Sequence, residues 1–80
     1  MRYADKKEAE DKVLKTIYHL SLEDPDRSTY LTNVQHATGL GQKEIQDICK
    51  ILIKRGQIER TNFRLTITDE GVNYAEKHFV

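Results

Sequence analysis

The 80-residue sequence has only one cysteine and no apolar run long enough to cross a membrane. A single cysteine excludes an internal disulfide, and a membrane-spanning helix needs about 18 or more apolar residues in succession. No secretory signal is visible, because charged side chains recur through the N-terminal segment from Asp5 to Lys15. From these absences we expect a soluble protein that resides in the cytoplasm.

Motifs for catalysis or metal binding are also absent from the sequence. The three histidines, His19, His36 and His78, lie far apart, and no zinc-ligand spacing surrounds Cys49. There is no glycine-rich phosphate loop, no nucleophile elbow and no obvious carboxylate pair with room for a substrate. A chain of this length also offers little space for a pocket. We therefore expect neither enzyme activity nor a metal, a cofactor or a small-molecule ligand.

The chain has no net charge, since 13 lysines and arginines balance 13 aspartates and glutamates. This balance is uneven along the sequence. Residues 41–64 carry six basic and three acidic side chains, whereas residues 1–26 and 65–80 each have an acidic excess of two. Binding to a polyanion depends on local lysine and arginine rather than on the total charge. A neutral chain with this distribution can therefore bind nucleic acid through residues 41–64.

Residues 41–55 have the pattern of an amphipathic helix. Gly41 is a permitted N-cap, Glu44 in the first turn suits the positive end of the helix dipole, and Gly56 can close the helix. The apolar spacing places four residues on one face: Ile45, Ile48, Cys49 and Leu52. The opposite face carries Lys43, Gln46, Asp47, Lys50 and Lys54. The pattern predicts a core-packed helix that displays a largely cationic surface.

A shorter helix is predicted just before this one, over residues 32–38. Thr32 can cap it, with a glutamine three residues later completing a capping box. Val34 and Ala37 are three residues apart and are expected to share its buried face. Gly39 supplies the left-handed backbone geometry that commonly ends a helix. Two helices joined by this tight turn form a helix-turn-helix pattern.

Beyond Gly56 the apolar spacing changes from helical to alternating, which predicts two short antiparallel strands joined by a turn at Thr61–Asn62. The inward-facing side chains are expected to be Ile58, Phe63, Leu65 and Ile67. For Phe63 we expect packing in the core or on the hairpin rather than stacking on a base. Thr68 can cap a last helix, whose apolar stripe is Val72, Ala75 and Phe79.

The N-terminal helix is predicted from Asp5, as its cap, to about Leu22. Its inward line is Val13, Ile17 and Leu20, and Leu14 and Tyr18 widen the apolar stripe. These two side chains either cover the core of the domain itself or contact a second subunit. The last helix, where Tyr74 and His78 flank the stripe, is the other candidate for a subunit interface. Dimerisation is expected, because 80 residues bury only a modest core.

The loop between the first two helices can include a short strand at Thr29–Leu31. Within this loop Arg27, Ser28 and Thr29 either reach a phosphate or belong to an ordinary solvated loop, because such residues are common in loops.

Two segments carry a resemblance to a known family. TGLGQKEIQDICKILIKRGQIER resembles the recognition-helix segment of winged-helix regulators of the MarR, PadR and ArsR type, and LTITDEG resembles the run that follows their wing. The resemblance implies an α+β, mostly helical fold. It also implies a winged helix-turn-helix, with a three-helix core, a short two- to three-stranded hairpin and a C-terminal helix in a single domain over residues 1–80. The partner that it implies is double-stranded DNA, and the role is that of a transcriptional regulator.

A contact surface follows from this resemblance and from side-chain chemistry. The helix over about residues 41–55 is expected to enter the major groove with Gln42, Lys43 and Gln46 nearest the base edges. Lys50 and Lys54 are expected to face the flanking phosphates. The resemblance carries the wing contact over to Arg60, Asn62 and Arg64, although the short turn between the strands cannot reach far into a minor groove.

A function of a different class stays open, because a fold does not fix a function. The same surface can dock onto a protein, since Glu44, Asp47 and Glu59 are interspersed with its basic residues. A purely solvated charged helix face is a third interpretation.

Overall fold

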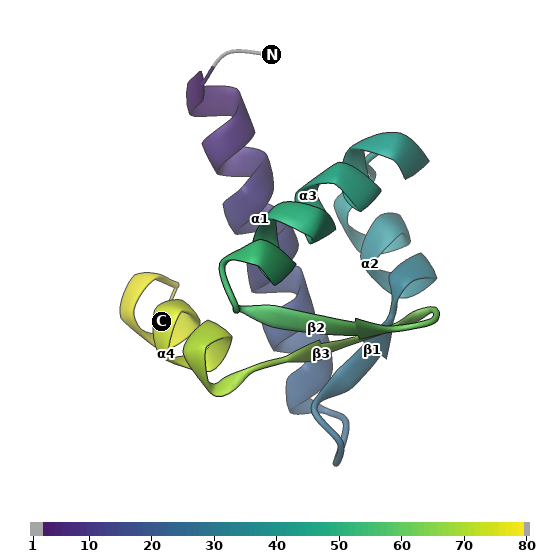
Figure 1. Cartoon of the computed structure of the whole chain (residues 1–80), viewed down its shortest axis with the longest axis vertical. Helices are drawn as coiled ribbons and strands as arrows, with labels where there is room; N and C mark the ends of the chain where they lie inside the picture. Colours follow the sequence, from purple (N-terminus) through teal and green to yellow (C-terminus); the bar gives the residue numbers. More distant parts are fainter. Residues whose placement is uncertain (1–2, 80) are drawn as a thin grey trace.

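The computed structural model describes residues 3–79, with side chains from residue 6 onward. In this range the chain forms four helices and three strands, in the order α1 (Tyr3–Leu22), β1 (Ser28–Tyr30), α2 (Leu31–Thr38), α3 (Gln42–Lys54), β2 (Ile58–Thr61), β3 (Arg64–Ile67) and α4 (Asp69–His78). The fold is α+β and mostly helical, as the sequence predicts (Figure 1). No described helix combines the length and the apolar character needed to cross a membrane.

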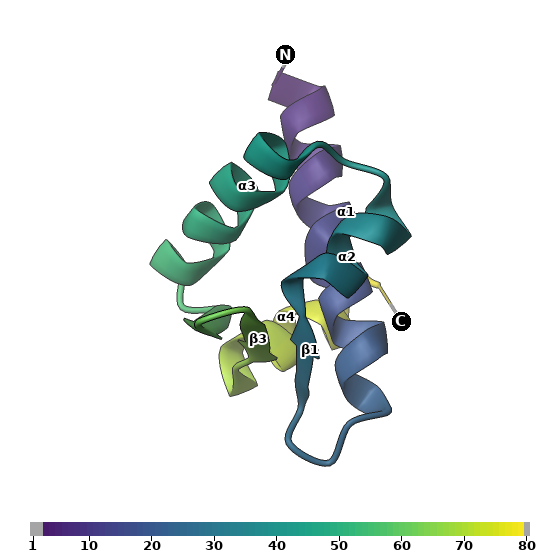
Figure 2. The same cartoon turned by 90° about the vertical axis from the view of Figure 1, so that its right-hand side faces the viewer.

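The three strands form one antiparallel sheet in the order β1-β3-β2. Tyr30 of β1 is paired with Arg64 of β3, and Ile58 of β2 is paired with Ile67. The short strand expected at Thr29–Leu31 is therefore present one residue earlier and belongs to the same sheet as the hairpin. Figure 2 shows the hairpin and α3 on one side of the molecule and α1 on the other.

Helix α1 is the central element of the core. It packs against α2, α3, α4, β1 and β3, and its Val13 and Ile17 side chains are completely buried. Leu14 and Tyr18 are buried too, so the wide apolar stripe of α1 covers the chain's own core. The helix is already formed at Tyr3, which places Asp5 inside the first turn rather than at the predicted cap.

Helix α3 agrees closely with its sequence pattern. Gly41 is its N-cap and Glu44 is in its first turn. The four residues of the apolar face are all buried: Ile45, Ile48, Cys49 and Leu52. Arg55 is the C-cap, and Gly56 follows with a φ of 76°, a left-handed conformation that favours glycine. The amphipathic spacing therefore fixes which face of α3 is available to a partner.

Two details of α2 differ from the prediction. The helix begins at Leu31 with Tyr30 as N-cap, so Thr32 is inside the first turn and caps nothing. Ala37 is exposed, and the buried line is instead Leu31, Val34 and Thr38. The Thr38 hydroxyl donates a hydrogen bond to the carbonyl of Val34 at 2.8 Å. Because this buried hydroxyl has a partner, a polar residue can occupy the position.

The tip of the hairpin also differs from the prediction. Phe63 does not face inward, because it lies in the turn between β2 and β3 and its side chain is 69% exposed. The turn is made by Asn62 and Phe63, and Asn62 has a φ of 56°, a conformation that asparagine tolerates better than most residues. Leu65 and Ile67 in β3 are buried as expected.

Helix α4 begins with the predicted cap. The Thr68 hydroxyl accepts from the Gly71 backbone N–H at 3.1 Å and donates to the Gly56 carbonyl at 2.6 Å. We expect Thr68→Ala to lower the free energy of unfolding by about 1 kcal/mol, because both partners lose their hydrogen bond. Urea unfolding of the variant measures this loss.

Thr32→Ala is the matched control for this capping prediction, since Thr32 has the sequence signature of a cap but no capping contact. Its free energy of unfolding should stay within about 0.5 kcal/mol of the parent value. Equal losses in the two variants would contradict the assignment of both caps.

Candidate nucleic-acid interface

A row of three lysines follows the exposed face of α3. Lys43, Lys50 and Lys54 are seven and four positions apart, so they lie along one side of the helix. All three are exposed. The ion pairs among the described side chains, Lys7–Asp11, Arg27–Asp69, Arg55–Glu10 and Arg64–Asp24, include none of them. Their charges are therefore available to a partner.

Two glutamines and an aspartate complete this face. Gln42 is exposed in the first turn of α3, and Gln46, one turn later, is half-buried. Asp47 is exposed between Lys43 and Lys50 in the same row, and its carboxylate reduces the local positive charge. The face thus combines cationic groups with amide groups that can both donate and accept hydrogen bonds.

The hairpin lies beside this helix. Strand β2 contacts α3, and the Arg60 guanidinium is close enough to Cys49 of α3 to act on its thiol electrostatically. Arg60 Nε donates to the Asn62 carbonyl at 2.9 Å, which holds this side chain across the hairpin tip. Arg60 and Asn62 are both exposed. Arg60 therefore takes part in no ion pair among the described side chains, and the uncharged Asn62 is exposed beside it.

Arg64, the third residue predicted to belong to a wing, already has partners in the chain. Its Nη2 donates to the Ser28 hydroxyl and lies 3.9 Å from Asp24 Oδ2, and its guanidinium carbon is 5.6 Å from the centre of the Tyr30 ring. These contacts join β3 to β1 and to the loop that follows α1. The charge of Arg64 is thereby partly neutralised, and its primary contribution is to the position of this loop.

The loop itself does not present the residues considered as phosphate ligands. Ser28 and Thr29 are buried in β1, so neither is a solvated loop residue nor available to a phosphate. Arg27 is exposed, but its Nη1 lies 3.0 Å from Asp69 Oδ1 at the start of α4.

Arg55, which belongs to the basic segment 41–64, points away from the lysine row. Its guanidinium is 2.9 Å from Glu10 Oε1 on α1, and this carboxylate is buried. The positive charge of Arg55 is therefore paired with a buried carboxylate, and this pairing offsets the cost of removing the carboxylate from water.

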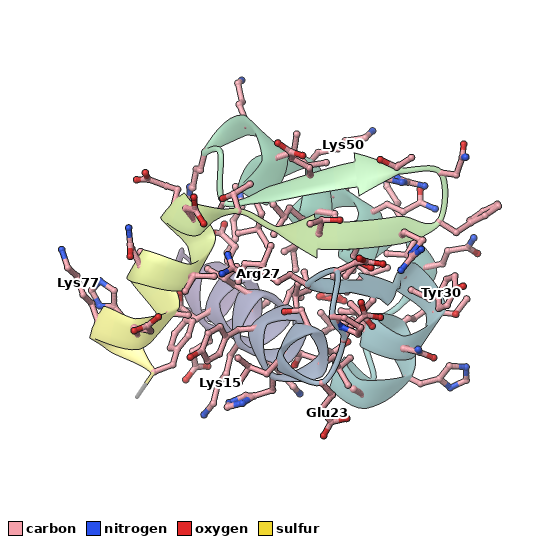
Figure 3. The ribbon with its side chains drawn as sticks, turned by 90° about the horizontal axis from the view of Figure 1, so that it is seen from below. Lys15, Glu23, Arg27, Tyr30, Lys50 and Lys77 are labelled. Carbon is pink, nitrogen blue, oxygen red and sulfur yellow. The ribbon has the colours of Figure 1, made fainter. Side chains whose placement is uncertain are left out.

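Figure 3 shows the two sides of the molecule. Lys50 extends from α3 on the side of the hairpin, whereas Lys15 and Glu23 extend from the opposite side. Helix α1 is neutral in sequence, with four basic and four acidic side chains, whereas α3 has three lysines and two acidic residues. The lysine row and the exposed hairpin residues together form the interface considered below, defined by Gln42, Lys43, Gln46, Lys50, Lys54, Arg60 and Asn62.

Three apolar side chains border this interface, and the sequence did not predict that they are exposed. Phe63 at the hairpin tip is 69% exposed, Tyr30 at the end of β1 is 53% exposed, and Ile53 on α3 is 38% exposed. Ile53 falls outside the apolar spacing of α3, which is the one sequence signal for its exposure. The sequence places Phe63 and Tyr30 in strands. In the structure Phe63 lies in the turn between β2 and β3, and Tyr30 is the last residue of β1 and the N-cap of α2.

The single cysteine, Cys49, is buried on the apolar face of α3, and its thiol is shielded from solvent. Burial raises the pKa of the Cys49 thiol from 9.0 to about 11, against a smaller opposite effect of Arg60. The uncharged thiol is favoured in the folded protein, so its contribution to stability is complete below pH 9 and is lost as the pH rises towards 11.

We therefore expect Cys49 to react slowly with a disulfide reagent such as DTNB at about pH 8. Thiolate is the reacting form, and the raised pKa lowers its fraction about 100-fold relative to the unfolded chain, before any shielding by the core. The rate of labelling, measured by absorbance with and without urea, tests this expectation. Equal rates in the two conditions would show that the thiol is accessible.

No model of a known protein family matches this chain, and no curated protein sequence is detectably similar to it. Function therefore has to be inferred from the arrangement of the side chains themselves.

Proposed function

We propose that the chain is a winged-helix domain that binds double-stranded DNA through the exposed face of α3. The observation that carries this proposal is the row of Lys43, Lys50 and Lys54, three exposed ammonium groups that take part in no ion pair among the described side chains. The major groove of B-DNA admits an α-helix, so ammonium groups in such a row can contact the phosphates on either side of the groove.

The order of the elements supports the winged-helix assignment. A tight turn at Gly39 joins α2 to α3, the β2–β3 hairpin follows α3 directly, and β1 pairs with β3. In this arrangement α2 and α3 form the helix-turn-helix and the hairpin forms the wing. The short turn at Asn62–Phe63 favours a wing that contacts the phosphate backbone over one that enters a minor groove.

Each residue of the interface has a role in this proposal. Gln42, Lys43 and Gln46 in the first half of α3 read base edges, because a glutamine amide pairs with adenine and a lysine with guanine. Lys50 and Lys54, together with Arg60 and Asn62 of the wing, bind phosphates and fix the register. Arg64 has a smaller role, because Asp24 and Ser28 already hold its guanidinium.

We further propose that the protein acts as a homodimer in transcriptional regulation. One subunit offers three lysines and the wing, which supports only modest affinity for DNA. Two subunits with their α3 helices about 34 Å apart meet successive major grooves on one side of B-DNA.

Fluorescence anisotropy with a labelled duplex at several salt concentrations tests the proposal. DNA binding should weaken steeply as salt rises, because phosphate contacts release counterions. Lys50→Ala should reduce the slope of log affinity against log salt by about one unit. Binding that is absent, or that does not change with salt, would contradict DNA as the partner.

A specific observation favours one alternative, a winged-helix module that docks onto a protein without binding DNA. Phe63, Tyr30 and Ile53 expose apolar surface beside the interface, and Asp47 and Glu59 place carboxylates among its basic groups. Aromatic side chains are enriched in protein interfaces, and mixed charge suits a protein as a partner. In this alternative, Phe63→Ala abolishes complex formation, whereas Lys50→Ala changes mainly its salt dependence.

A further inference from the structure

Two exposed aromatic residues lie close together at the tip of the β2–β3 hairpin. Phe63 in the turn and Tyr30 at the end of β1 are both more exposed than buried. Tyr30 is paired with Arg64, the residue after Phe63. The backbone N–H of Leu31, the residue after Tyr30, donates to the Phe63 carbonyl at 2.8 Å. Figure 3 shows Tyr30 extending from the same end of the molecule as the hairpin turn. The sheet therefore fixes aromatic residues from two separate segments at one place.

Neither ring contributes to the core. Phe63 and Tyr30 are absent both from the cluster of buried apolar side chains and from the half-buried residues packed against it. Neither ring is paired with another aromatic ring among the described side chains. Tyr30 is the N-cap of α2, but its side chain makes no capping hydrogen bond. Two adjacent exposed aromatic residues that stabilise nothing in the core indicate a contact surface for another molecule.

Two guanidinium groups accompany the aromatic residues. Arg60 Nε donates to a backbone carbonyl of the turn at 2.9 Å, and Arg60 takes part in no ion pair among the described side chains. The guanidinium carbon of Arg64 lies 5.6 Å from the centre of the Tyr30 ring, and Asp24 is 3.9 Å from its Nη2. Glu59 is also exposed, but it lies further from the turn than Arg60 along β2. The charge nearest the turn on β2 is therefore a cation without an ion-pair partner.

Exposed aromatic rings beside guanidinium groups are the features with which proteins bind unpaired nucleotides. The π-face of a base stacks on an aromatic ring, and a cationic side chain binds the phosphate of the same strand. Inside a continuous duplex both faces of a base are covered by its neighbours, so a base has to be unpaired or displaced before it can stack on a protein ring. The cation beside the rings favours a polyanionic strand over a protein as the partner.

We propose that the hairpin tip binds unpaired bases of DNA, so that the preferred target is a duplex with a single-stranded extension rather than a continuous duplex. Phe63 and Tyr30 each stack on one base, and Arg60 binds a phosphate of the same strand. The contact with the duplex rests on the proposed function of α3. Strand β2 contacts α3, which brings the hairpin tip beside the duplex and into the path of a strand that leaves it.

Anisotropy titrations with three labelled probes test this proposal. The probes are a blunt duplex, the same duplex with a single-stranded thymidine extension of about six nucleotides, and the extension alone. The extended duplex should bind at least about 10-fold more tightly than the blunt duplex, because each stacked base adds affinity. Equal affinities for the blunt and the extended duplex would overturn the proposal.

Leucine substitutions separate base stacking from a general apolar contact. Phe63→Leu and Tyr30→Leu keep an apolar side chain but remove the ring, and both positions lie outside the core, so the fold should be retained. The double variant should lower the ratio of the two duplex affinities from at least about 10 to about one. Circular dichroism verifies the fold. A double variant that keeps the ratio of the parent protein would overturn the proposal and leave the aromatic residues to a protein partner.

The extension alone separates this proposal from the proposed function of α3. The parent protein should bind it more tightly than the double variant does, whether or not α3 binds a duplex. Binding of the blunt duplex, together with equal affinities of the parent and the double variant for the extension, would overturn base stacking and leave the function of α3 intact. Binding of the extension that needs the rings, without binding of the blunt duplex, would contradict the function of α3 and support the site at the hairpin tip.

Leu22→Ala is the matched control, because Leu22 is also a large exposed apolar residue but is the last residue of α1. Its ratio of affinities for the extended and the blunt duplex should equal that of the parent protein. A decrease equal to that of Phe63→Leu would indicate a general effect of exposed apolar surface and would overturn the site.

Discussion

Replacing Lys43, Lys50 and Lys54 together with alanine is expected to lower the affinity for duplex DNA by about two orders of magnitude at about 0.1 M salt. Each lysine that meets a phosphate releases about one counterion, so the loss of Lys50 and Lys54 should decrease the salt slope by about two units, while the loss of Lys43 removes a contact to a base. The three side chains are exposed and make no ion pair in the described chain, so their removal should leave the fold intact. Anisotropy titrations give the affinity, and circular dichroism verifies the fold.

A charge-matched variant controls for the loss of total positive charge. Lys12, Lys15 and Lys77 are equally exposed but lie on α1 and α4, and Figure 3 shows Lys15 and Lys77 away from Lys50. Replacing these three with alanine should change the affinity for DNA by less than about threefold, because distant charges are screened in salt. Equal losses in the two triple variants would mean that binding depends on net charge and not on α3.

Gly71→Ala is expected to destabilise the protein by about 3 kcal/mol, although alanine is normally the better helix former. A Cβ at Gly71 would lie 2.1 Å from the Gln57 carbonyl oxygen and 2.8 Å from Ile67 Cγ1. The carbonyl is backbone and is fixed by a hydrogen bond from the Thr68 N–H. Helix α4 would therefore have to move away from the hairpin, with a fall in melting temperature of about 10–20 °C.

Asn73→Ala is the control for this prediction, because Asn73 is exposed on the same helix. Its melting temperature should stay equal or rise slightly, since alanine has the higher helix propensity. Calorimetry or thermal circular dichroism measures both variants. A Gly71→Ala protein as stable as Asn73→Ala would contradict the close packing of α4 on the hairpin.

Local patterns predict much of the fold correctly. Helix α3 has a cap, a complete apolar face and a terminal glycine, and each of these depends only on residues within a few positions of one another. Thr68 illustrates the same point, because its capping contact is to Gly71, three residues later. Where the spacing, the cap and the terminator agree, the helix and its buried face can be predicted from the sequence.

The errors occur where a distant contact outweighs the local signal. Thr32 has a capping signature, but the pairing of β1 with β3 continues to Tyr30 and α2 begins immediately after it. Phe63 fits the alternation of a strand, but the turn at Asn62 places it at the hairpin tip. Ala37 fits one possible buried line of α2, whereas the packing of Thr38 selects another.

The candidate interface is predictable only in part for the same reason. The exposed lysines follow from the amphipathic pattern of α3, since a residue opposite a buried face is solvent-exposed. The partners of Arg55 and Arg64 lie on α1 and in the loop after it, and no local pattern links such distant residues. Two of the six basic side chains in segment 41–64 are thus committed to contacts that the sequence alone does not reveal.

An NMR titration with an unlabelled duplex is the most direct test of the proposal that the lysine face of α3 contacts DNA. Shifts should concentrate on the amides of residues 42–54 and of the hairpin tip at 60–63, and raising the salt concentration should reverse them. The exposed side of α1 around Lys15 should be unaffected. Shifts confined to α1 and α4, or none at a saturating duplex concentration, would contradict it.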